Sequence, residues 1–186
     1  EKVYGLSEPN NFENGTHILN LQDEYDWTIK ANPLIRSAHH KLLAVRQARP
    51  SPLKDDKILT AWNGLMIAAM AKANQVLGEA RFLDAARRAA QFLKQNLMSD
   101  RGLLRRYRDG EANFDGYLDD YAYLISGLLT LYETDFDLSW IDWARELQAK
   151  QDELLWNEQL GAYYFSRAGD PHLIRRSVDF VDGARP

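Results

Sequence analysis

The sequence predicts an all-α protein, namely a partial α/α toroid (six-hairpin glycosidase-like) built from helical hairpins, with short β-hairpin-like loops. Three observations support this prediction. Segments that are apolar around most of their circumference alternate with segments that carry a single apolar face. This alternation recurs with a period of roughly sixty residues. Stacked units of this kind bury their cores only against their neighbours, which favours a curved array of inner and outer helices.

The composition is that of an ordinary globular domain. The chain has 186 residues, of which 45% are hydrophobic and 27% are charged, and its formal net charge is -4. Lys and Arg are scattered, which argues against a nucleic-acid partner. Polar residues interrupt the longest apolar run and no signal peptide heads the chain, so we expect no membrane partner and a cytoplasmic location. The absence of cysteine excludes disulfides, thiol nucleophiles and thiolate metal sites.

Two helices are expected before the repeat. Residues 1–22 are rich in Asn, Gly, Glu and Pro, which predicts a linker or extended arm with a turn at the Asn-Gly step of residues 14–15. A first helix is expected over residues 23–31, because acidic side chains in its opening turn suit the helix dipole. A second is expected over residues 33–47, since it opens on a proline and "ARPSP" follows it.

The first repeat unit combines an inner and an outer helix. Residues 55–77, "DDKILTAWNGLMIAAMAKANQVL", are apolar on nearly every side, so this helix should be buried almost all round and should end at Gly78. Residues 79–97 carry one apolar face opposite a row of charged side chains. This second helix should lie outside, against the first.

The second unit repeats the pattern over residues 118–135 and 138–155. Aligning the two units places one Asp pair over another and Gly64 over Gly127. The tails "SDRGLLRRY" and "NEQLGAYYF" both put a glycine turn before a short strand-like run. Two full units are too few for a closed ring, and the sequence stops without a closing helix. We therefore assign residues 23–186 to an incomplete toroid domain from a longer protein.

Three segments, in this order and spacing, resemble one known family: "PSPLKDDKILTAWNGLMIAAMAKA", "FDGYLDDYAYLISGLLTLYE" and the final "DGARP". The family is that of the spermatogenesis-associated protein 20-like, thioredoxin-domain-containing proteins, and the similarity spans essentially the whole chain. It implies a thioredoxin-like domain followed by a six-hairpin toroid similar to those of N-acylglucosamine 2-epimerases and glycosidases. Because the thioredoxin-like domain is absent from this chain, the resemblance implies no redox activity here.

Polar residues gather where the inner helices are expected to begin, and in a toroid these ends open onto one face of the cavity. Acidic groups in a partly desolvated pocket can split their pKa values, so that one donates a proton while another stays ionised, as sugar hydrolysis or epimerisation requires. The predicted catalytic residues are Asp55, Asp56, Asp119 and Asp120. The predicted substrate-binding residues are Lys57, Trp62, Asn63, Arg106, Tyr107, Asp115, Tyr117 and Tyr121.

Structural roles compete with these functional ones. An Asp pair at a helix start is also what N-capping favours, by about 0.5 to 2 kcal/mol, and one Asp can cap while its neighbour faces the cavity. Trp62 could stack on a sugar, but it is also typical of a core or cavity wall. Asn63 needs partners inside a buried helix, so it either locks a neighbouring loop or touches the ligand. Arg106 and Tyr107 could reach an anionic group of the ligand.

No metal or cofactor is expected. His39 and His40 are adjacent in a helix and point in different directions, unlike the i, i+4 pair of a helical zinc site. The sequence also shows no Ser-His-Asp arrangement, phosphate-binding glycine loop or dinucleotide fingerprint.

Two functions remain open. The first is a carbohydrate-binding or carbohydrate-processing toroid segment, epimerase-like or glycosidase-like, that acts only in the complete protein. The second is a non-catalytic scaffold serving the absent thioredoxin-like domain. Carboxylates without partners would favour the enzyme, whereas carboxylates bonded to amides or arginines would favour the scaffold. Half a toroid should also expose apolar flanks, so we expect the chain to self-associate.

Overall fold

The computed structural model describes residues 2–7, 9–21, 32–169 and 173–178. The helix expected over residues 23–31 and the final "DGARP" lie outside the described residues. The chain divides into two compact units, Glu1–Lys54 and Asp55–Pro186, and each is described by itself. The expected domain boundary at residue 23 stays a prediction.

The described residues of the first unit form short turns and one long helix. Its elements are η1 (Lys2–Tyr4), η2 (Glu13–Gly15) and α1 (Pro33–Gln47). The predicted Asn-Gly turn is confirmed, since Asn14 and Gly15 have φ angles of 56° and 71°. α1 begins at the proline, as predicted, and the side chain of Asn32 caps it by accepting a hydrogen bond from the Leu34 amide.

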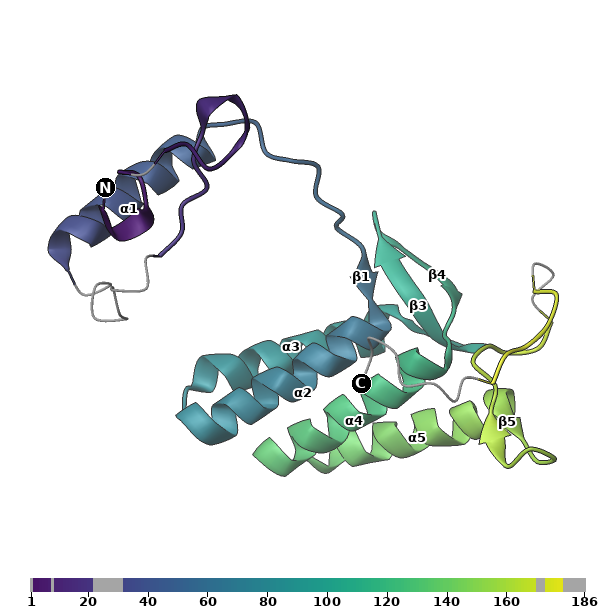
Figure 1. Cartoon of the computed structure of the whole chain (residues 1–186). Coiled ribbons are helices and arrows are strands. Elements are labelled where there is room, and N and C mark those ends of the chain that lie inside the picture. Colours follow the sequence, from purple (N-terminus) through teal and green to yellow (C-terminus); the bar gives the residue numbers. More distant parts are fainter. Residues whose placement is uncertain (1, 8, 22–31, 170–172, 179–186) are drawn as a thin grey trace. The chain divides into compact units, whose positions relative to one another are not determined.

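The second unit contains two helical hairpins that lie side by side (Figure 1). Their helices are α2 (Thr60–Leu77), α3 (Ala80–Asn96), α4 (Leu118–Asp135) and α5 (Leu138–Leu155). α2 packs along α4 as the inner pair, while α3 lies against α2 and α5 against α4. The predicted fold class, a segment of an α/α toroid, is confirmed. Among the described residues, no helix has both the length and the apolar character needed to cross a membrane.

The inner helices touch through the two glycines that the repeat aligns. A Cβ atom on Gly64 would lie 2.5 Å from the carbonyl carbon of Tyr123, and one on Gly127 would lie 2.5 Å from the carbonyl oxygen of Gly64. Only glycine allows this approach of the two backbones. The core around the contact is apolar and includes Ile67, Ala71, Leu93, Leu124, Leu128, Leu131 and Leu147.

A small antiparallel sheet covers the end of this unit at which α2 and α4 begin (Figure 1). Its strands are β1 (Ile58–Leu59), β2 (Met98–Ser99), β3 (Gly102–Arg108) and β4 (Glu111–Asp115), and β3 pairs with the other three. A second, two-stranded sheet follows α5 and consists of β5 (Trp156–Asn157) and β6 (Ala162–Tyr163). Both repeats therefore end in the predicted β-hairpin-like loops.

The start of α2 corrects one prediction. The helix begins at Thr60, not at residue 55, because the two residues before it pair with β3 as strand β1. The Thr60 hydroxyl also donates to the Leu104 carbonyl at 2.6 Å, which ties the helix start to the sheet. Asp55 and Asp56 lie before β1 and do not cap the helix.

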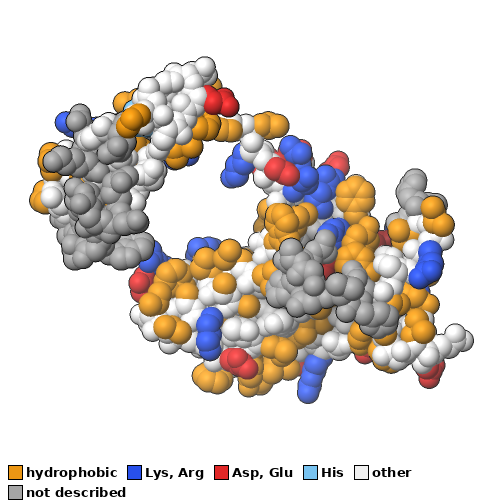
Figure 2. All heavy atoms as spheres, viewed as in Figure 1, with side chains coloured by type: hydrophobic (Ala, Val, Ile, Leu, Met, Phe, Trp, Pro, Cys, Tyr) orange, Lys and Arg blue, Asp and Glu red, His pale blue; other side chains and the backbone are white. Residues whose placement is uncertain are grey.

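The burial of α2 corrects a second prediction. α3 and α4 cover two sides of the helix, but a further side exposes large apolar side chains, so the helix is not buried all round. The exposed fraction is 69% for Trp62, 52% for Met66 and 72% for Val76. Hydrophobic side chains are visible on the surface over the inner helices in Figure 2. The end of α2 at Gly78, with φ of 69°, agrees with the prediction.

Candidate functional site

The candidate site lies where the sheet meets the first turns of the inner helices. Asp120, in the first turn of α4, is fully buried there. Its Oδ1 accepts the Ala61 amide of α2 at 3.0 Å, and its Oδ2 accepts the Tyr117 amide at 2.9 Å. One carboxylate thus satisfies unpaired amides at the starts of two inner helices, which are the places where a helix favours negative charge.

Arg105 of β3 joins this carboxylate to its neighbour. Its Nη1 donates to Oδ2 of Asp120 at 2.8 Å and to Oδ1 of Asp119 at 3.1 Å, and its guanidinium lies 4.6 Å from the centre of the Tyr117 ring. Burial lowers the pKa of Arg105, but the two carboxylates outweigh it and the net pKa rises. The arginine therefore stays charged within a partly buried cluster of two acids and one base.

For Asp120, in contrast to Arg105, the effect of burial on the pKa outweighs the effect of the partners. Burial raises the pKa of this carboxyl to about 6, because loss of water outweighs the two amide donors and Arg105. A carboxyl group with a pKa near neutral has the proton affinity that a general acid or base needs. Its side chain is fully buried, however, so in this chain it contacts protein groups alone.

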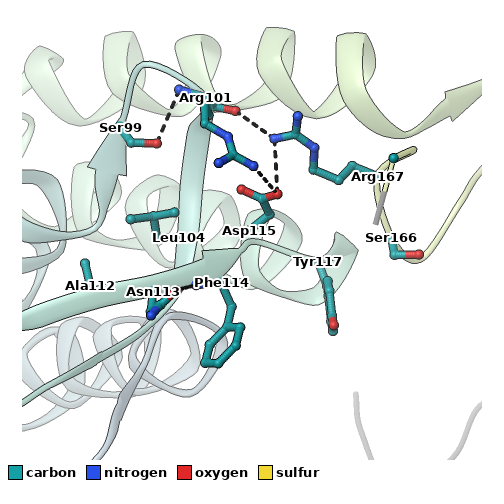
Figure 3. A pocket seen from close by; sticks show the side chains of 11 residues that line it. Ser99, Arg101, Leu104, Ala112, Asn113, Phe114, Asp115, Tyr117, Ser166 and Arg167 are labelled. Carbon is teal, nitrogen blue, oxygen red and sulfur yellow. Dashed lines mark hydrogen bonds and ion pairs between the residues drawn. The ribbon is translucent and has the colours of Figure 1, made fainter. Parts of the chain in front are cut away.

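A hollow of about 490 Å³ lies next to this cluster, between β4 and the loop that follows β6 (Figure 3). Asp115, at the end of β4, binds two arginines on its rim: its Oδ2 lies 2.9 Å from Arg101 Nη2 and 3.4 Å from Arg167 Nη1. The lining residues are Ser99, Arg101, Leu104, Ala112, Asn113, Phe114, Asp115, Tyr117, Ser166, Arg167 and Gly169.

Phe114 has an unusual backbone at the edge of this hollow. Its φ is 63°, a left-handed value that bulky residues rarely adopt. The β3–β4 register pairs the residues on either side of it but leaves Phe114 without a strand partner, and its amide donates instead to Oδ1 of Asn113 at 2.8 Å. The ring is 58% exposed and lies 5.0 Å from the guanidinium of Arg106.

The two aspartate pairs do not meet, contrary to the prediction. Asp55 binds Lys57 at 3.0 Å, and Asp56 binds Nε of Arg108 at 2.8 Å. Arg108 lies three residues along β3 from Arg105, which puts their side chains on opposite faces of the sheet. Asp119 and Asp120 are therefore separated from the first pair by the strand.

Trp62 and Asn63 take different places in the first turn of α2. Trp62 is exposed, so it is not a core residue, and its aromatic face is accessible; the cavity-wall and sugar-stacking roles stay predictions. Asn63 donates from its amide nitrogen to the Leu59 carbonyl at 2.8 Å, so it locks the start of its own helix. This bond lies within the helix start and not with a neighbouring loop, and a contact of Asn63 with a ligand stays a prediction.

The remaining predicted binding residues divide between the hollow and the core. Asp115 and Tyr117 line the hollow. Tyr121 is buried, and its hydroxyl accepts the Leu103 amide at 2.9 Å. Tyr107 packs its ring edge against Phe92. Neither of these last two tyrosines faces the hollow.

Of the eleven residues that line the hollow, only Asp115 and Tyr117 were predicted; the nine others include Arg101, Phe114 and Arg167. Phe114 could not be predicted from the sequence, because the direction of its ring depends on a positive φ angle, which is not expected at a phenylalanine. Arg101 and Arg167 follow the outer helices of the two repeats but do not occupy matching positions, so comparing the two tails does not single them out. Within the described residues, no group of three or more His, Cys, Asp or Glu side chains could hold a metal ion.

Comparison with known proteins accounts for the whole chain. It is 34% identical to spermatogenesis-associated protein 20 of Rattus norvegicus and 33% identical to that of Homo sapiens, and each alignment covers 100% of the chain and 27% of the relative. The chain is homologous to spermatogenesis-associated protein 20. The predicted resemblance to the spermatogenesis-associated protein 20-like proteins is confirmed, and the chain spans 27% of the length of these relatives. No family model matches the chain.

Solved structures share the fold of part of the chain. Cellobiose 2-epimerase from Bacillus thermoamylovorans matches with a TM-score of 0.56 and 20% identity, over 61% of this chain and 30% of that one. A D-mannose isomerase matches with a TM-score of 0.54 and 17% identity, over 58% and 30%. The GH76 alpha-mannanase of Bacteroides thetaiotaomicron matches with a TM-score of 0.55 and 18% identity, over 61% and 33%. At these identities the likeness establishes the α/α toroid fold alone.

Proposed function

We propose that the complete protein binds or processes a carbohydrate at the end of the toroid where the β3–β4 hairpin meets the inner helices. The observation that supports this best is the shared fold, since the matching structures are named as an epimerase, an isomerase and a mannanase. The chain is 27% of its relatives' length, so the proposal concerns the complete protein, with this chain supplying part of the site.

The hollow offers the groups that a sugar needs. Phe114 and Tyr117 present aromatic rings on which the apolar face of a sugar ring can stack, and Asn113 and Asp115 can hydrogen-bond its hydroxyls. Ligand sites of this kind combine a mainly apolar wall with a few polar groups that fix orientation. Trp62 could extend the stacking surface from α2, because its ring is exposed.

Among the predicted catalytic residues, we retain Asp119 and Asp120 as the candidate acid pair. Tyr117, which lines the hollow, donates its amide to Asp120, so the pair lies next to the hollow. The pKa of Asp120, about 6, is suited to proton transfer near neutral pH. Asp55 and Asp56 lie across the sheet from this pair and are assigned no direct role in the same reaction.

The pairing of the carboxylates supports the alternative function as well. Each candidate aspartate is bonded to a basic side chain, an amide or both, as expected of a non-catalytic scaffold. We therefore propose sugar binding for this chain and reserve catalysis for the complete toroid. Turnover by the complete protein separates the two functions.

The test measures binding and turnover of neutral mono- and disaccharides by the complete protein, with titration calorimetry for binding and NMR for products. At least one sugar should bind, and Asn113→Ala together with Tyr117→Ala should weaken it about ten-fold or more, since each removes a contact worth about 1 kcal/mol. The matched control is Asp84→Asn, an exposed position on α3. If no sugar binds or reacts, the proposal is wrong.

The exposed apolar side of α2 supports a second proposal, that this chain self-associates when the remaining hairpins are missing. Light scattering should detect dimers or larger assemblies of the chain. Trp62→Glu together with Met66→Glu should shift them towards monomer, because charge is costly to bury in an interface. A monomeric wild-type chain would contradict this proposal.

A further inference from the structure

The charge of the hollow bears on the kind of sugar it accepts. Two arginines line it, Arg101 from the β2–β3 turn and Arg167 from the loop after β6, whereas Asp115 is the single acid among the described lining residues. Both guanidinium groups contact the same oxygen of Asp115, so one carboxylate offsets two positive charges. The lining keeps a net positive charge in a protein whose overall formal charge is -4.

Within the part of the chain that the structure describes, the contacts of the two arginines use only some of their donors. A guanidinium has five N–H donors. Arg101 gives one contact to Asp115, and Arg167 gives one to Asp115 and one to the Arg101 carbonyl at 3.5 Å. Asp115 thus holds two guanidinium groups close together at one rim of the hollow (Figure 3), and their other N–H groups contact no further described residue. Paired guanidinium groups are suited to a carboxylate or phosphate.

Phe114 provides an observation, independent of the two arginines, that this hollow is a binding site. A left-handed phenylalanine costs of order 1–3 kcal/mol, and such strain clusters at binding sites. The register pairs Leu104 with Asp115 and Arg106 with Asn113, so in a regular strand Phe114 would stand opposite Arg105 with its ring on the same face of the sheet. Its φ of 63° instead leaves the ring exposed at the hollow. The strained backbone therefore leaves an aromatic ring on the lining of the hollow that also holds the two arginines.

We propose that this hollow takes an acidic sugar, one that carries a carboxylate or a phosphate, with its anionic group on Arg101 and Arg167 and its ring against Phe114. The inference rests on the proposed carbohydrate function and specifies its substrate class. Asp115 is a positioning residue, since it acts by holding the two arginines.

The test compares neutral hexoses (glucose, galactose and mannose) with the corresponding uronates and 6-phosphates, and with inorganic phosphate, by titration calorimetry on the complete protein. At least one acidic sugar should bind about ten-fold or more tightly than its neutral counterpart. Binding of uronates or of 6-phosphates identifies which anionic group is recognised. Equal binding of neutral and acidic sugars would overturn this inference and leave the proposed function standing. If no sugar binds, the proposed function fails as well, whereas inorganic phosphate that binds as tightly as the sugar phosphates would overturn this inference alone.

Substitutions then assign the preference to residues. Arg167→Gln and Arg101→Gln should each remove most of the preference for acidic sugars while neutral sugars bind as before. The side chain of Arg101 is 70% exposed, so its loss leaves the fold intact. Arg88→Gln, on an exposed position of α3, is the matched control and should change nothing. An unchanged preference in both variants would exclude these arginines as the anion site.

Phe114→Gly separates stacking from charge. Glycine adopts a φ of 63° without strain, so the fold should keep its stability. The affinities for neutral and for acidic sugars should both fall by the same factor. A selective loss of the acidic sugars would contradict the stacking role of the ring.

Discussion

The two inner helices begin in different ways, although the repeat aligns them. α4 carries Asp119 and Asp120 in its own first turn, whereas α2 begins behind Leu59 with no side-chain cap from its own segment. The missing cap is supplied by Asp120, which bonds the first turns of both helices. The first hairpin therefore depends on the second for its N-terminus, and the two hairpins form a single structural unit.

The loops after the outer helices differ as well. After α5 the chain forms a sheet of two short strands, but after α3 it forms the longer β3–β4 hairpin, which carries Arg105, Phe114 and Asp115. Local hairpins of this kind can lengthen while the helices beneath them keep their packing. As a result, the loops of the first repeat unit carry most of the candidate site, and the loop after the second contributes Arg167.

The largest effect is expected where the two inner helices are most alike. Gly127→Leu should lower the free energy of unfolding by about 3 kcal/mol or more, because even its Cβ would collide with the backbone of α2. Urea unfolding followed by tryptophan fluorescence measures the change. Gly78→Ala is the control, because a Cβ there meets no atom within 4 Å and only the backbone strain remains. Similar losses in the two variants would mean that the Gly64–Gly127 contact is not close.

The next largest effect is a difference in stability between variants of the two aspartate pairs. Asp120→Ala should cost about 3 kcal/mol, since it leaves two helix amides and Arg105 without their acceptor in a buried place. Asp56→Ala should cost less than about 1 kcal/mol, because its ion pair with Arg108 is exposed to solvent. Urea unfolding at pH 7 compares the two variants. Equal costs would contradict the role of Asp120 as the shared cap.

The ionisation of Asp120 gives a pH-dependent difference between wild type and Asp120→Asn. Its pKa is raised from an ordinary value of 3.8 to about 6, so the folded state binds the proton more tightly than the unfolded state. This contribution to stability is complete below pH 4 and is lost as the pH rises through 6. The wild-type advantage over Asp120→Asn should therefore shrink by about 2 kcal/mol between pH 4 and pH 7.

Urea unfolding at several pH values measures this difference. The contributions of the other carboxyl groups are the same in both proteins and cancel. The groups that face Asp120 are Asp119 on its own helix, Arg105 from β3 and the Ala61 amide from α2. A wild-type advantage that grows with rising pH would show that attraction to Arg105 outweighs the cost of burial.

Much of the fold could be predicted because it follows from local patterns. The two kinds of helical periodicity identified inner and outer helices, and Gly64 and Gly127 helped to align the two repeat units. The structure adds that these two glycines are where the inner helices touch. The start of α2 could not be predicted in this way. It depends on β1 pairing with β3 and on Asp120, which is 59 residues from Ala61 in the chain.

The candidate site was predicted less completely for a similar reason. Asp115 and Tyr117 were found because they precede an inner helix, where the toroid geometry places a cavity. Arg101 and Arg167 meet only because loops of both repeats approach the same carboxylate. A contact between two distant loops leaves no periodic signal in either segment.

The smallest effect concerns the C-terminal ends of the same two helices. Both end in a left-handed residue, but α2 uses Gly78 with φ of 69° and α4 uses Phe136 with φ of 58°. Phe136 is 72% exposed, so its ring recovers little of the strain by burial. Phe136→Gly should therefore raise the free energy of unfolding by about 1 kcal/mol, and Gly78→Ala should lower it by about the same amount. Thermal unfolding of both variants measures the two changes. A loss of stability in Phe136→Gly would mean that the contact of its ring with Tyr132 is worth more than the strain, and that the second hairpin needs an aromatic residue where the first needs only glycine.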